Sequence, residues 1–215
     1  MIDVVRFINS RFTSNTYVIY STDSEIIWVV DPGDFAPVEE WMQRNSKKDI
    51  AGVLITHAHF DHIYGANDLY EKYPFTTFYV YNQIGVEILY DSKKNGSKYT
   101  DLPFILNDSA NVSTVSAEMN LWDDCKIHVY HTPGHSEDSM CILLDKILFT
   151  GDTLIKDIRT VTKLKGGSVE KLQESISWIE TLKGNKIVVY GGHEDQFELD
   201  NYDLSIATTN KLQNT

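Results

Sequence analysis

The sequence predicts an α/β fold that forms a single domain over residues 1–215. Strand-like runs rich in β-branched and aromatic residues alternate with segments that carry apolar residues at helical spacing. The order is strands, helix, strand and helix, followed by strands, helix and strand, which suggests two similar halves. No low-complexity segment or linker divides the chain, and its length is ample for a sizeable core.

The first half begins with three short strands, because β-branched and aromatic residues dominate there. The turn "DPGD", from Asp31 to Asp34, stops the third strand. The helix that follows places Val38, Trp41 and Met42 on one side. In chain order we expect strands at residues 4–8, 16–20 and 25–31, a helix at 36–44, a strand at 51–56, a helix at 65–73 and a strand at 76–81.

The second half contains the clearest helix of the chain, at residues 168–184. Ser168 can cap its start and Gly184 can end it. The residues at helical spacing are Val169, Leu172, Ile176, Ile179 and Leu182. Strands are expected at residues 126–131, 139–144, 146–150 and 186–190.

Residues 83–124 fit neither pattern well. They begin with helical spacing and pass into lysine, asparagine, glycine and serine, which predicts a surface excursion. Segments of that length in compact domains are often functional lids.

The composition limits the classes of partner. The net charge of −12 argues against a nucleic-acid-binding protein, since such proteins usually carry a basic face. The N-terminus lacks a signal-peptide pattern, and no run approaches the roughly 18 apolar residues of a membrane helix. We therefore expect a cytoplasmic protein that binds a small-molecule substrate, with no membrane or nucleic-acid partner; its oligomeric state stays open. Cys125 and Cys141 are expected to be buried free thiols.

The stretch "THAHFDHIYG", from Thr56 to Gly65, places three histidines and an aspartate within six residues at the end of a predicted strand. His57 and His59 are two residues apart, so both imidazoles can face one metal ion. After the turn, Asp61 and His62 can face a second ion. Imidazole with carboxylate suits zinc, and also iron or manganese. A single histidine is usually an ordinary surface or packed residue, but this cluster is hard to explain without a cation.

Three further residues of ligand type each follow a strand-like run. His135 follows a Pro-Gly turn in "TPGH", Asp152 follows Gly151 in "GDTL", and His193 follows two glycines in "GGHE". Ligands of α/β proteins gather at strand ends in this way.

With these four motifs in this order, the chain resembles the metallo-β-lactamase superfamily and, within it, the glyoxalase II-like (hydroxyacylglutathione hydrolase-like) group. The resemblance implies a four-layer αββα sandwich and two divalent metal ions, zinc first, with iron or manganese also suited. It assigns the first ion to His57, His59 and His135. It assigns the second ion to Asp61, His62 and His193, with Asp152 as the bridge.

The implied reaction is hydrolysis of a thioester or ester of a small molecule. Two metal ions would supply hydroxide at neutral pH, and Asp61 would orient it as the catalytic residue. Asp152 stands where several antibiotic-hydrolysing relatives carry cysteine or serine, which argues against a β-lactamase. Asn95 and Ser97 resemble an Asn-x-Ser pair of the glyoxalase II-like group. Because the chain ends soon after His193, without that group's glutathione-binding extension, we expect a smaller thioester or ester.

Other interpretations remain open at this stage. A mononuclear iron persulfide dioxygenase of the same fold would bind its iron with His57, His135 and Asp152. A non-catalytic partner-binding member is the third possibility. Two interpretations of Asp31 stay open: it lies near the metal ions, or it is an ordinary turn residue. The stretch "GGS", residues 166–168, is an anion-binding turn or a helix cap. We expect His128 to be an ordinary strand histidine, and leave the role of His131 undecided.

Overall fold

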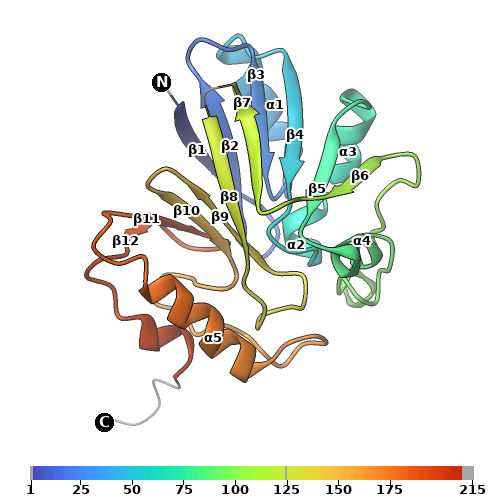
Figure 1. Cartoon of the computed structure of the whole chain (residues 1–215). Helices are drawn as coiled ribbons and strands as arrows, with labels where there is room; N and C mark the ends of the chain where they lie inside the picture. The colour runs from blue at the N-terminus through green and yellow to red at the C-terminus, as the bar shows by residue number, and fades with distance from the viewer. Residues whose placement is uncertain (1, 124, 210–215) are drawn as a thin grey trace. The chain divides into compact units, whose positions relative to one another are not determined.

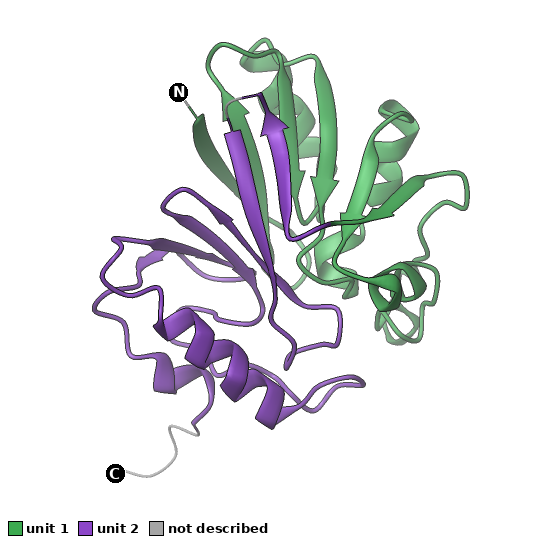
Figure 2. Ribbon diagram, in the orientation of Figure 1, with its two compact units in different colours: residues 1–115 green, residues 116–215 purple. Residues whose placement is uncertain are grey.

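The computed structural model describes residues 2–123 and 125–209. The chain divides into two compact units, Met1–Val115 and Ser116–Thr215 (Figure 2). Each unit contains one six-stranded sheet with its helices.

The sheet of the first unit has the strand order β1-β2-β3-β4-β5-β6 (Figure 1). The first three strands pair antiparallel, as short connections allow, and the strands from β3 to β6 pair parallel. The strands are β1 (Ile2–Ile8), β2 (Asn15–Ser21), β3 (Ile26–Val30), β4 (Asp49–Leu54), β5 (Thr77–Val80) and β6 (Asn111–Thr114).

The helices of this unit are α1 (Phe35–Arg44), α2 (Phe60–Ile63), α3 (Ala66–Lys72) and α4 (Gln83–Leu89), with the 3₁₀ helix η1 (Ser97–Tyr99). Alternate strand residues such as Val18, Val29 and Phe78 form a core with residues of these helices, including Val38 and Met42 of α1. This follows from the period of two along a strand and of 3.6 along a helix. In β2 and β3 the intervening residues, such as Ile19 and Trp28, are also buried.

The sheet of the second unit has the order β12-β11-β10-β9-β8-β7. Its strands are β7 (Glu118–Trp122), β8 (Cys125–His131), β9 (Met140–Leu144), β10 (Ile147–Gly151), β11 (Val188–Gly191) and β12 (Phe197–Glu198). Strands β10 and β11 pair parallel, and α5 (Val169–Glu180) lies between them in the sequence, because parallel neighbours need a long connection. The 3₁₀ helix η2 (Leu204–Ala207) follows β12.

Helix α5 supplies much of the core of the second unit. Leu172, Ile176 and Ile179 pack in one buried cluster with Leu148 of β10 and Val189 of β11. Ser168 is the N-cap, and its hydroxyl accepts a hydrogen bond from the Lys171 N–H at 3.2 Å. The predicted cap is therefore confirmed, whereas the helix ends at Glu180, four residues before Gly184.

The α/β class with two mixed sheets flanked by helices agrees with the sequence prediction. The helical start expected for residues 83–124 is confirmed by α4, but the surface excursion expected after it was wrong in part, because this stretch also contains β6 and β7. Both strands lie at the edge of their sheet, and β6 reads Asn-Val-Ser-Thr with three exposed residues. An edge strand of this kind needs no apolar alternation, so its sequence carries no strand signal. That residues 1–215 form a single domain stays a prediction.

Both cysteines are buried free thiols, as predicted. Among residues 2–123 and 125–209, no helix has the length and apolar character needed to cross a membrane.

The capping bond of Ser168 gives a first prediction. Ser168→Ala should lower the free energy of unfolding by about 1 kcal/mol, because the Lys171 N–H loses its acceptor. Urea denaturation measures the change. The matched control is Ser177→Ala on the same helix, where the hydroxyl only bonds back to the Gln173 carbonyl at 2.8 Å. Equal destabilisation by both substitutions would contradict the capping role.

Burial raises the pKa of the Cys141 thiol from 9.0 to about 12. The folded chain therefore holds this thiol protonated, and in a Cys125→Ala background it should react with a thiol reagent at pH 8 only as fast as the protein unfolds. The unfolded thiol ionises first, so its contribution to the free energy of unfolding is full below pH 9 and is lost between pH 9 and about 12. Rapid labelling of the folded protein would contradict this prediction. Comparison with Cys125→Ala/Cys141→Val isolates the pH dependence.

Candidate metal centre

The histidine motif of the first unit lies at the carboxyl ends of two parallel strands. Strands β3 and β4 pair in register, with Val30 opposite Leu54, and the Asp31 N–H donates to the Leu54 carbonyl at 3.0 Å. The residues that follow are Asp31 on one strand and Thr56 with the motif on the other. The sheet therefore brings together residues that are 25 positions apart in the sequence.

Asp31 is buried and holds the motif through three hydrogen bonds. Its carboxylate accepts from the Thr56 N–H at 2.7 Å and from the Thr56 hydroxyl at 2.6 Å. The third contact is to His62 Nδ1 at 3.0 Å. Because a carboxylate only accepts, His62 carries its hydrogen on Nδ1 and its lone pair on Nε2, as a metal ligand requires. Of the two interpretations left open for Asp31, the structure supports the one that places it beside the candidate metal ligands.

The same carboxylate acts on His57 through Thr56. The Thr56 hydroxyl donates its hydrogen to Asp31, so at 3.2 Å from His57 Nδ1 it is the acceptor. This assigns the lone pair of His57 to Nε2. The ring of His57 lies 4.3 Å from that of His62 and 4.8 Å from that of His59, measured between centroids.

Neighbouring loops fix the rest of the motif. The Ser14 hydroxyl donates to the Asp61 carbonyl at 2.5 Å, and the Phe60 N–H donates to the Asn95 carbonyl at 2.9 Å. Gly65 closes the motif against the Asp31–Asp34 turn, where a Cβ atom would lie 1.8 Å from the Gly33 carbonyl oxygen. Only glycine allows this approach.

Asn95 and Ser97 have a structural part in this support. Both are buried, and both side chains donate to the Phe104 carbonyl, at 3.0 Å each. They brace the loop whose carbonyl holds the start of α2.

In the second unit, His135, Asp152 and His193 lie close together. Strands β10 and β11 pair Gly151 with Gly191, which puts the residues after them at the same sheet edge. Asp152 Oδ2 lies 3.6 Å from His135 Nε2 and 3.7 Å from His193 Nε2. His135 Nδ1 donates to the Val161 carbonyl at 2.9 Å, which leaves Nε2 as its ligand nitrogen.

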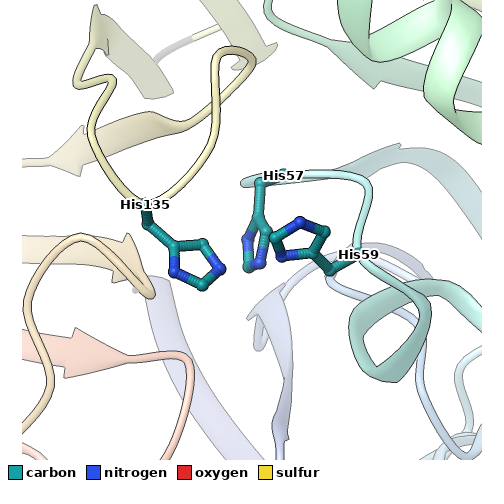
Figure 3. A group of neighbouring side chains, drawn as sticks. All are labelled: His57, His59 and His135. Atoms are coloured by element: carbon teal, nitrogen blue, oxygen red, sulfur yellow. The ribbon is translucent and has the colours of Figure 1, made fainter. Parts of the chain in front are cut away.

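Figure 3 shows three of these side chains as sticks, with His57 and His59 on the segment after β4 and His135 on the loop after β8. His135 is buried, whereas Asp152 and His193 are partly exposed.

The donors fit a borderline divalent cation such as zinc, iron or manganese, because they are imidazole nitrogens and carboxylate oxygens. Two ligands held by one tetrahedral ion at about 2.1 Å lie roughly 3.4 Å apart. The 3.6 Å and 3.7 Å separations around Asp152 are close to that value, as is the 3.6 Å between His62 Nε2 and Asp61 Oδ2. Carboxylates and imidazoles crowded to such separations gain most from a shared cation.

The two remaining histidines lie on β8. His128 is partly exposed, with Nδ1 3.3 Å from Glu118 Oε1, as expected of an ordinary strand histidine. His131 is exposed, and its Nε2 bonds to the Glu137 carbonyl at 2.9 Å. The positioning roles of Ser14, Thr56 and the Val161 carbonyl were missed from the sequence. A backbone carbonyl carries no sequence signal, and hydroxyl residues are common.

Comparison with known proteins agrees with the fold and the donor set. Residues 10–193 match the model of the metallo-β-lactamase superfamily. The chain therefore belongs to that superfamily. The α/β metallo-β-lactamase fold predicted from the motifs is confirmed.

Individual relatives are similar at modest identity. A hydroxyacylglutathione hydrolase of Pseudoalteromonas translucida is 27% identical over 84% of this chain, and the match spans 62% of that protein. A probable metallo-hydrolase of Methanocaldococcus jannaschii is 29% identical over 85% of this chain and 88% of its own length. The crystal structure of BLEG-1 B3 metallo-β-lactamase superposes with a TM-score of 0.81 at 26% identity, covering 92% of this chain and 94% of that one.

Asp31→Asn tests the role assigned to the buried carboxylate. The amide cannot accept all three hydrogen bonds, so His62 and His57 lose their fixed orientation. We expect metal affinity to fall by about 10- to 100-fold, measured by competition with a chromophoric chelator. The control, Asp101→Asn, removes an exposed carboxylate that only pairs with Arg11. Unchanged affinity in Asp31→Asn would contradict the role.

Proposed function

We propose that this protein is a dinuclear metallo-hydrolase that cleaves a thioester or ester of a small molecule. The observation that carries the proposal is the grouping of its donor atoms. Potential ligand atoms form three groups in which they lie within 4.8 Å of one another (Figure 3 draws the first). The groups are His57, His59 and His135; His57, His62 and Asp152; and Asp61, His62 and His193.

We assign the first group to one metal ion and the third group to a second ion, with Asp152 shared by both. This division agrees with the one that the sequence motifs imply. It is also supported by the tautomers of three histidines, since hydrogen bonds direct Nε2 of His57, His62 and His135 toward a ligand role.

When bound, two divalent cations lower the pKa of a water to roughly 7 and stabilise negative charge on the substrate. Asp61 accepts a hydrogen bond from the attacking water and orients it. The water oxygen bonds to the carbonyl carbon and the carbon–sulfur or carbon–oxygen bond breaks. The leaving group departs with a proton, so the products are a carboxylic acid and a thiol or an alcohol.

The relatives support this class of substrate without defining it. Hydroxyacylglutathione hydrolase is the name of a relative only 27% identical. The similarity to a B3 metallo-β-lactamase makes a β-lactam the proper competing substrate in an assay. The presence of Asp152, instead of the cysteine or serine of several antibiotic-hydrolysing relatives, favours the thioester.

Metal content of protein purified without added metal is the first test, measured by elemental mass spectrometry together with hydrolysis of a thioester panel and a chromogenic β-lactam. About two zinc or manganese ions per chain and thioester turnover support the proposal. One iron per chain with oxygen uptake on persulfides would replace it by the dioxygenase. Turnover of the β-lactam alone would replace it by a β-lactamase.

A pair of histidine variants tests the ligand assignment. His193→Ala should remove about one metal ion per chain and reduce hydrolysis at least about 100-fold, because one ion loses a ligand. The matched control is His128→Ala, which removes a histidine whose neighbour is Glu118. Full metal content in His193→Ala would sink the assignment of that residue.

A further inference from the structure

Residues 156–165 form a basic segment in an acidic chain. The segment contains four cationic residues and one acid, Asp157, which gives 4 − 1 = +3, whereas the whole chain has a net charge of −12. The cationic residues are Lys156, Arg159, Lys163 and Lys165. Exposed apolar side chains lie between them, with Ile158 38%, Val161 51% and Leu164 52% exposed.

The lysines of the basic segment lack carboxylate partners. Five lysines elsewhere each form an ion pair with a glutamate, namely Lys48, Lys72, Lys94, Lys126 and Lys183. In the described part of the chain, Lys156, Lys163 and Lys165 form no ion pair with any carboxylate. The acidic residues in that part of the chain therefore do not pair with these three lysines.

The backbone of the segment is tied to the two loops that carry metal-type ligands. The Val161 carbonyl accepts from His135 Nδ1 at 2.9 Å, and the Thr160 hydroxyl donates to the carbonyl of Thr153, which follows Asp152, at 3.0 Å. Neither contact involves a lysine side chain, so the lysines do not hold the segment in place. They project from a backbone held at the edge of the donor cluster of the second unit.

Backbone hydrogen bonds also hold the end of the segment in place. The Gly167 N–H donates to the Leu164 carbonyl at 2.9 Å, and the Ser168 N–H donates to the Gly134 carbonyl at 2.9 Å. A Cβ atom on Gly167 would lie 2.3 Å from the Thr162 carbonyl oxygen, so only glycine permits this turn. The loop displays Lys163 and Lys165 on a fixed frame, which limits the ordering entropy lost when they bind a ligand.

The start of α5 is not part of this feature. The Ser168 hydroxyl accepts from Lys171 N–H and donates to Glu170, so it caps the helix. A carboxylate at this position opposes the binding of an anion there.

We propose that the basic segment binds the phosphates of the leaving thiol, so that the preferred substrate is a thioester of a phosphate-bearing thiol such as coenzyme A. The inference rests on the proposed function and deepens it. Lysine binds phosphate as a point charge and arginine binds it as a fork. Coenzyme A carries about four negative charges from its phosphates, which matches the segment. A glutathione thioester carries about one net negative charge, and it makes little use of a segment with a charge of +3.

Binding of adenosine 3′,5′-bisphosphate to the metal-loaded protein is the first test, because this probe has the phosphates and lacks the thiol that would contact metal. Calorimetry should give binding that weakens with salt. Removal of three cations should weaken it about tenfold or more. The test variant carries Lys156→Gln, Lys163→Gln and Lys165→Gln.

The matched control removes three positive charges from other places in the same unit. It carries Lys126→Gln, Lys146→Gln and Lys183→Gln. Retained binding in the control with loss in the test variant supports the inference. Equal loss in both variants, or no binding to the wild type, overturns it. Wild-type binding to phosphatidylserine vesicles without bisphosphate binding would make the segment a membrane contact and would also overturn it.

Turnover separates this inference from the proposed function. The ratio of kcat/KM for acetyl-coenzyme A to kcat/KM for the acetyl thioester of N-acetylcysteamine should fall about tenfold in the test variant and stay constant in the control. Hydrolysis of the neutral thioester with no wild-type preference for the coenzyme A ester refutes the inference and leaves the proposed function standing. If metal-loaded protein hydrolyses no thioester, both fall.

Discussion

The buried carboxylate of Asp31 is the constraint on which the first unit's ligands depend. A charge at 1% exposure is costly unless it is paired and hydrogen-bonded, and Asp31 meets this need with Thr56 and His62. Its backbone has a positive φ of 54°, which an aspartate adopts only at some cost. That strained turn directs the carboxylate at the motif, so one residue orients His62 directly and His57 through a hydroxyl.

In the second unit, a backbone atom orients a candidate metal ligand. A carbonyl, that of Val161, orients His135, whereas a carboxylate orients His62 in the first unit. The consequence for sequence change is different in the two cases. Any substitution at Asp31 reaches the candidate metal ligands His62 and His57, but side chains of the basic segment can change while the Val161 carbonyl stays in place. The proposed recognition of substrate can therefore diverge in this segment without loss of the candidate metal ligands.

These differences explain how far the sequence could predict the structure. Ligand residues follow buried strands, often after glycine, so the strands and all seven candidate ligands were identifiable from local patterns. Strand β6 was missed because it lies at a sheet edge and its residues carry no apolar alternation. Strand β7 alternates Met119 and Leu121 with Glu118 and Asn120 and could have been identified. The role of Asp31 stayed ambiguous because its partners are 25 and 31 residues away. Contacts of Ser14 and Val161 depend on tertiary structure and leave no local signal.

The charge distribution of the chain lets the basic segment orient the proposed substrate. With a net charge of −12, the chain as a whole repels an anionic thioester, and this repulsion is screened beyond roughly 8 Å at physiological salt. Local cations then orient the substrate, because its phosphate end gains energy beside the cationic residues of the segment 156–165. The other end of the substrate, which carries the thioester carbonyl, then faces His135. The ring of His135 is held by the Val161 carbonyl of the same segment. Acidic surroundings thus disfavour the reversed, unproductive orientation, a form of specificity that needs no contact with the acyl group.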